Sequence, residues 1–89
     1  MPYIKQGNRK ALEEKYGAQM LDYIPTNPGE LNFVLTLIIR DYLRGRGVLS
    51  SYQDYNDVIG ALEACKLELY RRKIVPYEEG KIDENGDVW

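Results

Sequence analysis

The chain contains no histidine, so any acid, base or metal chemistry must use carboxylates, tyrosines, lysines and arginines. This absence removes the commonest general base, the Ser-His and Cys-His nucleophile pairs and the commonest metal ligand. The carboxylate pairs Asp54 with Asp57 and Glu78 with Glu79 have a spacing that acid-base catalysis can use. The same residues are expected in a capped helix start and in a solvated acidic segment. We therefore expect a protein that is not an enzyme.

An acidic triplet, Asp83-x-Asn85-x-Asp87, has the spacing of the oxygen ligands that open an EF-hand loop. Val88 stands where that loop needs a glycine for its sharp turn. The triplet is therefore expected to be a turn with solvated acids. The sequence predicts neither a metal site nor another cofactor.

Positive charge is concentrated in two clusters. Their members are Arg40, Arg44 and Arg46 in the first, and Arg71, Arg72 and Lys73 in the second. Both clusters fall in predicted last helical turns, where the helix dipole favours cations. Glu68 precedes Arg71 and Arg72 by three and four residues, which is the favourable order for solvated ion pairs on a helix. Arg40 and Arg44 are nevertheless like charges four residues apart, which is unfavourable unless an anion or a carboxylate lies between them. Anion binding stays open beside the structural explanation.

Eight tyrosines are a high number for 89 residues. A tyrosine supplies apolar area and a hydroxyl group, which suits a core, an interface or a stacking platform for a base. Those in apolar helical patterns are expected in the core or an interface: Tyr16, Tyr42 and Tyr55. Tyr52, Tyr70 and Tyr77 lie beside polar residues at the ends of a predicted helix, so they are better candidates for ligand contact.

The bulk composition is that of one ordinary globular domain, residues 1–89, with 44% hydrophobic and 29% charged residues. A net charge of −2 makes nucleic acid an unfavoured partner. The single cysteine, Cys65, is expected to be a buried small hydrophobic residue in a reducing compartment. Neither a membrane span nor a signal peptide is predicted, so we expect a cytoplasmic protein, in the host cytoplasm if a phage encodes it.

Three helices are predicted, over about residues 8–23, 28–44 and 52–74. Asn8 is the expected N-cap of the first, Gly17 interrupts it, and the Asn27-Pro28-Gly29-Glu30 sequence is a strong start for the second. Ser51, with Asp54 three residues later, opens the third. Its core face is expected to carry Tyr55, Val58, Ile59, Leu62, Cys65 and Leu69.

The second predicted helix is apolar around most of its circumference. Two partner helices in so short a chain can hardly cover it, so a second subunit is the expected cover. A small-residue face on the third helix would let another helix approach closely, and it carries Gly60, Ala61, Ala64 and Cys65.

Pro76 is expected to end the third helix near Ile74. Asn85-Gly86 is the strongest two-residue hairpin signal and predicts a short β-hairpin or hook over about residues 81–89. The predicted fold class is therefore mainly all-α: a compact three-helix domain with a short C-terminal hairpin or hook, assembling as a homo-oligomer.

Three segments, PGELNF at 28–33, the Ser51–Arg72 stretch and the Pro76–Trp89 stretch, together resemble a family of small uncharacterised proteins of bacteriophages, prophages and bacteria. That resemblance carries no settled activity. The phage context suggests an analogy with small, catalytically bare, oligomeric phage proteins that sequester nucleotide signals of bacterial immunity.

The favoured hypothesis is a non-catalytic homo-oligomer that binds a nucleotide-like anion, such as a cyclic nucleotide or an ADP-ribose-type signal. Phosphates would contact the cations and bases would contact tyrosine or asparagine side chains. The candidate ligand-binding residues are Asn32, Tyr52, Asn56, Tyr70, Arg71, Arg72, Tyr77 and Lys81. The alternative is a protein-protein interaction module of phage or bacterial origin without a small-molecule ligand.

Overall fold

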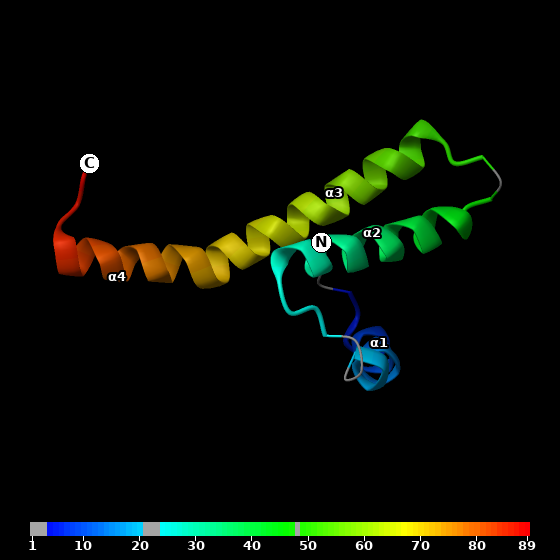
Figure 1. Cartoon of the computed structure of the whole chain (residues 1–89), viewed down its shortest axis with the longest axis horizontal. Coiled ribbons are helices and arrows are strands. Elements are labelled where there is room, and N and C mark those ends of the chain that lie inside the picture. The colour runs from blue at the N-terminus through cyan, green and yellow to red at the C-terminus, as the bar shows by residue number, and fades with distance from the viewer. Residues whose placement is uncertain (1–3, 21–23, 48) are drawn as a thin grey trace. The chain divides into compact units, whose positions relative to one another are not determined.

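A computed structural model of the chain describes residues 4–20, 24–47 and 49–89, and these residues are mainly helical (Figure 1). The elements in chain order are α1 (Gln6–Met20), α2 (Pro28–Arg44), α3 (Tyr52–Leu69), the π-helix η1 (Tyr70–Ile74) and α4 (Val75–Asn85). The part of the chain that the structure describes contains no strand. The expected mainly helical class is confirmed.

The chain divides into two compact units. One contains α1, α2 and the first two turns of α3, up to Val58, and the other contains Ile59–Trp89. The candidate ligand-binding residues are distributed between these units.

Helix α2 begins and ends at the predicted residues, Pro28 and Arg44. The Asn27 side chain accepts a hydrogen bond from the Glu30 backbone N–H at 2.9 Å, and Glu30 in turn accepts from the backbone N–H of Thr26 at 3.0 Å and from the Thr26 hydroxyl. The bond from Glu30 to Asn27 satisfies one of the N–H groups that the first turn of a helix leaves without partners, and the bonds from Thr26 hold the preceding residue against that turn. At the other end Gly45 keeps helical dihedral angles, and the left-handed conformation falls at Gly47, with φ at 121°.

The start of α2 predicts a pH dependence. The hydroxyl and the backbone N–H of Thr26 hold the pKa of the Glu30 carboxyl below its ordinary value. A carboxyl whose pKa is lower in the folded state stabilises the fold at pH values above the unfolded pKa, about 4.3, and loses this contribution as the pH falls through the folded pKa. We expect the stability difference between the wild type and Glu30→Gln to be largest near pH 6 and to shrink toward pH 3.

Denaturation curves at several pH values, with Glu79→Gln as the control, measure this effect. Glu79 is an exposed carboxylate with no hydrogen bond among the described residues. A Glu30→Gln difference that stays constant or grows as the pH falls contradicts the assignment.

Helix α1 begins at Gln6, two residues before the predicted cap Asn8, which therefore lies inside the helix. The first hydrogen bond joins the Arg9 N–H to the Lys5 carbonyl at 2.9 Å. The interruption predicted at Gly17 was either a kink or a stop. The backbone continues in helical conformation through Gly17, so a stop there was wrong; isolated glycines in helices cost only about 1 kcal/mol. Residues 21–23, where the predicted helix ends, lie outside the described part of the chain.

The start of α3 at Tyr52 confirms the prediction. The Ser51 hydroxyl accepts from the Asp54 N–H at 3.2 Å, and the Asp54 carboxylate accepts from the Ser51 N–H at 2.9 Å. This reciprocal pair is a capping box with aspartate in place of the usual glutamate.

Pro76 does not end the helix at Ile74, and this prediction was wrong. The ribbon passes without a break from α3 through η1 into α4 (Figure 1). A proline inside an α-helix clashes with the carbonyl four residues earlier. Here the preceding turn is widened to a π-helix, in which the Val75 N–H donates to the Tyr70 carbonyl five residues back, and Pro76 follows in the first turn of α4. The wider turn thus accommodates the proline ring without ending the helix.

The predicted hairpin over residues 81–89 was also wrong. Residues Lys81–Asn85 belong to α4, and residues 86–89 form no regular element. The hairpin turn favoured by Asn-Gly needs positive φ at both residues, whereas only Gly86 has it, with φ at 88°. The Gly86 N–H donates to the Ile82 carbonyl at 2.8 Å, so this glycine ends a helix.

The predicted buried core is not present in the single chain, because no described residue is buried. On the expected core face of α3, Val58 is half-buried, whereas Tyr55, Ile59 and Cys65 are exposed. The prediction that Cys65 is buried was therefore wrong. Periodicity identifies which face of a helix is apolar, but it does not supply the element that covers that face.

Candidate functional site

Five of the eight candidate ligand-binding residues lie in one short segment of helix. Tyr70, Arg71 and Arg72 belong to η1, and Tyr77 and Lys81 belong to α4. The other three lie in the other unit, Asn32 on α2 and Tyr52 and Asn56 at the start of α3. All eight side chains are exposed. The structure therefore groups the basic and aromatic candidates of η1 and α4, which we call the η1–α4 segment (Tyr70–Lys81).

Tyr77 and Lys81 contact each other across one turn of α4. The Lys81 Nζ lies 5.6 Å from the centroid of the Tyr77 ring, within the range of a cation–π interaction. The Tyr77 residue is still 62% exposed, so it keeps apolar area that a planar ligand could cover. A phosphate could contact this lysine while an attached base stacks on the neighbouring ring.

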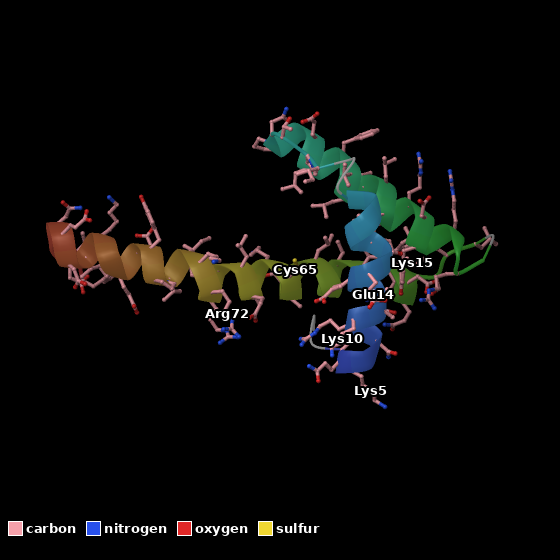
Figure 2. All side chains as sticks on the ribbon, turned by 90° about the horizontal axis from the view of Figure 1, so that it is seen from below. Lys5, Lys10, Glu14, Lys15, Cys65 and Arg72 are labelled. Carbon is pink, nitrogen blue, oxygen red and sulfur yellow. The ribbon has the colours of Figure 1, made fainter. Side chains whose placement is uncertain are left out.

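Arg71 and Arg72 share one carboxylate, Glu68. Arg71 contacts both Glu68 oxygens, at 2.9 and 3.2 Å, and the Arg72 Nε donates to one of them at 2.8 Å. The Glu68 side chain is only 24% exposed beneath the two arginines, whose own side chains remain more than 60% exposed. Figure 2 shows Arg72 reaching away from the ribbon. The carboxylate thus orients both guanidinium groups, and it also competes with any external anion for them.

The helix dipole does not explain the second basic cluster as the sequence suggested. Arg71, Arg72 and Lys73 were expected in a last helical turn, but the helix continues to Asn85. The dipole effect is confined to the terminal turn, so these cations lie too far inside the helix to gain from it. Arg44, in contrast, does lie in the last turn of α2, where it also approaches Asp41 at 3.7 Å.

A shallow open groove of about 320 Å³ lies between α4 and residues 86–89. It is lined by Glu78, Lys81, Ile82 and Asn85 of α4 and by residues 86–89. Lys81 is the one candidate residue in this lining, and its ammonium group pairs with Glu84 at 3.3 Å. Glu78 and Asp87 give the lining of the groove more negative than positive charge. A phosphate would therefore bind more favourably to the arginines of η1 than in this groove.

Comparison with known proteins places the chain in a family without an assigned activity. The family model described as Domain of unknown function (DUF6899) matches residues 1–88. The chain belongs to this family. No curated protein and no solved structure matches it.

For this DUF6899 chain, the chemistry of the exposed side chains is thus the only guide to function. Within the described residues no group of three or more cysteine or carboxylate side chains could hold a metal ion. No helix in that part of the chain has the length and apolar character to cross a membrane. Sequence reasoning anticipated the ion pairs of Glu68 but missed the contact of Arg46 with the Tyr42 ring, at 4.5 Å, which four-residue spacing could have suggested.

The shared carboxylate yields a prediction about anion affinity. Glu68→Gln removes the negative charge that competes for Arg71 and Arg72 and keeps the length of the side chain. We expect anions that use these guanidinium groups, with tripolyphosphate as the probe, to bind about threefold to tenfold more tightly, since an exposed ion pair contributes up to about 1 kcal/mol. Titration calorimetry at low salt measures the change.

Glu63→Gln is the matched control, because Glu63 pairs with Lys66 at 3.1 Å on the same helix. Equal gains in both variants would show that net charge, rather than release of the two arginines, sets the affinity. Weaker binding after Glu68→Gln would show that the carboxylate positions the arginines for the anion.

Proposed function

We propose that this chain is a non-catalytic protein that binds and holds a nucleotide-like anion as a homo-oligomer. The observation that carries the proposal is the η1–α4 segment. It presents two exposed arginines held by one carboxylate, a lysine against a tyrosine ring and a second exposed tyrosine, all within twelve residues of continuous helix. These are the groups that phosphates and bases use.

Each part of a nucleotide has a partner in this proposal. Phosphates contact Arg71, Arg72 or Lys81, because charge-assisted hydrogen bonds are the strongest contacts available to them. Bases stack on Tyr70 or Tyr77. Asn32, Tyr52 and Asn56, in the other unit of the chain, offer two amide groups and a further ring as ligand contacts of their own.

The biological setting that fits these properties is a phage-type protein that sequesters a nucleotide signal of host immunity. A sequestering protein needs affinity and abundance but no catalytic group, and a chain without histidine is consistent with that requirement. The small size of the chain, 89 residues, supports the same analogy with phage proteins of this class.

The test is to incubate the purified protein with cyclic dinucleotides and with ADP-ribose derivatives, remove unbound nucleotide, and release the bound fraction by heat. We expect at least one nucleotide to be retained and released chemically unchanged. A converted product would replace the proposal with an enzyme, and retention of none of these nucleotides would overturn the proposal.

Substitution of the two arginines locates the site. Arg71→Ala with Arg72→Ala removes two charge-assisted contacts of about 1.5 to 3 kcal/mol each, so the retained nucleotide should bind at least about tenfold more weakly. Lys66→Ala is the control, because Lys66 is an exposed cation of α3 paired with Glu63. The oligomeric mass should be the same in both variants.

A second candidate is a protein-protein interaction module, and the exposure of apolar side chains favours it. Leu67 and Leu69 of α3 are each 56% exposed, next to the small residues Ala64 and Cys65. A host or phage protein that binds with 1:1 stoichiometry in purified form, and that no nucleotide displaces, would support this reading. Loss of binding after Ala64→Arg would place the contact on the small-residue face.

A further inference from the structure

The four residues after α4, which we call the tail (Gly86–Trp89), place two large apolar side chains in water. Val88 is 93% exposed and Trp89 is fully exposed. Within the tail, the Trp89 N–H donates to the Asp87 carboxylate at 3.0 Å. A tryptophan on a short segment is the type of anchor that dominates binding interfaces, since it buries a large area at a low entropy cost.

Charge and apolar character follow a fixed order along this end of the chain. Asp83 and Glu84 lie in the last turn of α4, Asp87 follows Gly86, and the two apolar residues come last. A surface that matches the tail must therefore offer positive charge at one end and an apolar patch at the other, about 7 to 10 Å away for a stretch of two to three extended residues.

One face of α2 has that arrangement. Phe33, Leu37, Arg40 and Arg44 follow one another at intervals of four, three and four residues, so they lie along one side of the helix; we call this the mixed face. Its apolar and basic halves are seven residues apart from Phe33 to Arg40, which is about 10 Å along a helix. Phe33 is 64% exposed.

The cations of the mixed face form few ion pairs with carboxylates of the described residues. Arg40 has no ion pair among the described residues, and Arg44 has only the 3.7 Å contact with the exposed Asp41. Two like charges four residues apart repel each other unless an anion approaches both. Acidic residues of a docked tail would relieve this repulsion.

We propose that the tail of one copy of this chain docks antiparallel on the mixed face of α2 in a second copy. Trp89 and Val88 cover Phe33 and Leu37, and Asp83 and Asp87 approach Arg40 and Arg44. Each copy supplies one tail and one mixed face, so a dimer with a two-fold axis contains two such contacts. This inference rests on the homo-oligomer of the proposed function but not on its nucleotide ligand.

Charge complementarity points to a second copy as the occupant. Every copy carries both the acidic residues Asp83 and Asp87 and the basic residues Arg40 and Arg44, so two copies can each offer one tail and one mixed face to the other.

The single tryptophan of the sequence makes the inference measurable. We expect the emission of Trp89 to shift to shorter wavelength and to become less accessible to acrylamide as protein concentration rises, in step with the mass found by sedimentation. Reversal of the mixed face, Arg40→Glu with Arg44→Glu, should weaken tail docking by at least about tenfold. Arg9→Glu with Lys10→Glu on α1 is the control for net charge.

A mixing experiment identifies whose tail is bound. Variant one carries Arg40→Glu and Arg44→Glu, and variant two carries Asp83→Lys and Asp87→Lys. Alone, each pairs like charges and should leave Trp89 exposed. Mixed in equal amounts, each tail meets a face of opposite charge on the other variant, so protection of Trp89 should return. Circular dichroism checks that both variants remain helical.

The outcomes separate the hypotheses. Protection in a chain that carries all four reversals, without protection in the mixture, would show that the tail docks on its own chain. An oligomer whose Trp89 stays exposed at every concentration overturns the docking proposal and leaves the oligomer intact. A chain that is monomeric at every concentration overturns both the docking proposal and the oligomeric part of the proposed function, whatever nucleotide it retains.

Discussion

Replacing Ile38 by glutamate is expected to lower the free energy of unfolding by about 3 kcal/mol or more, and to abolish the oligomer. Leu31, Leu35, Ile38 and Tyr42 follow one another at intervals of four, three and four residues along α2, the spacing of a helix that pairs with another helix. Ile38 is 50% exposed in the single chain. If this stripe were to remain in water, a charged residue at its centre would change stability by only about 0.5 kcal/mol.

Thr36→Glu is the matched control, because Thr36 is an exposed residue of the same helix on its polar side. It adds the same charge and the same side chain without entering the apolar stripe. Denaturant unfolding and sedimentation of both variants decide the question. Equal, small changes in the two variants would show that α2 is not covered by a second subunit.

Replacing Pro76 by alanine is expected to convert η1 into ordinary α-helix. The alanine restores a backbone N–H and removes the ring that requires the wider turn, which should stabilise the helix by about 1 to 3 kcal/mol. Conversion of the π turn to α-helix, with no residue removed, also rotates α4 by about 100° relative to the end of α3. We therefore expect a more stable helix that holds the proposed nucleotide less tightly, because the rotation changes the orientation of Tyr77 and Lys81 relative to Arg71 and Arg72.

Nuclear magnetic resonance can follow the hydrogen bond of the Val75 N–H, which should move from the Tyr70 to the Arg71 carbonyl. Pro28→Ala is the control, since Pro28 occupies the first helical position of α2, where a proline costs little. Unchanged nucleotide affinity in a fully α-helical Pro76→Ala variant would separate the π-helix from the binding site.

Predictions made from local chemistry were accurate where the deciding atoms are close in sequence. The start of α2 follows from Asn27 and Glu30, and that of α3 from Ser51 and Asp54, because each cap is completed within four residues. The pairs of Glu68 with the arginines of η1 were predictable for the same reason.

Predictions failed where two local rules compete or where the deciding partner is distant. Pro76 predicts a helix end, but a π turn offers another solution that spacing alone does not reveal. Asn85-Gly86 fits both a hairpin and a helix terminus, and the helical preference of the preceding residues decided between them. The exposure of Cys65 could not be predicted from periodicity, because burial depends on a covering element that the sequence pattern does not name.

The candidate site was predictable in composition but not in grouping. The sequence identified Tyr52 and Asn56 at the start of the expected third helix, and cations with tyrosines at and beyond its end. Only the structure shows that Lys81 contacts the Tyr77 ring and that the basic cluster lies inside a continuous helix.

The absence of a buried side chain among the described residues has a consequence for backbone amide exchange with solvent. A helix without tertiary cover behaves like a peptide helix, and such helices of fewer than about 12 to 15 residues are marginal in water. The amides of α1, whose 15 residues lie at this limit, would then exchange rapidly in a lone protomer. Slow exchange in α1 would therefore mark a surface that another molecule protects.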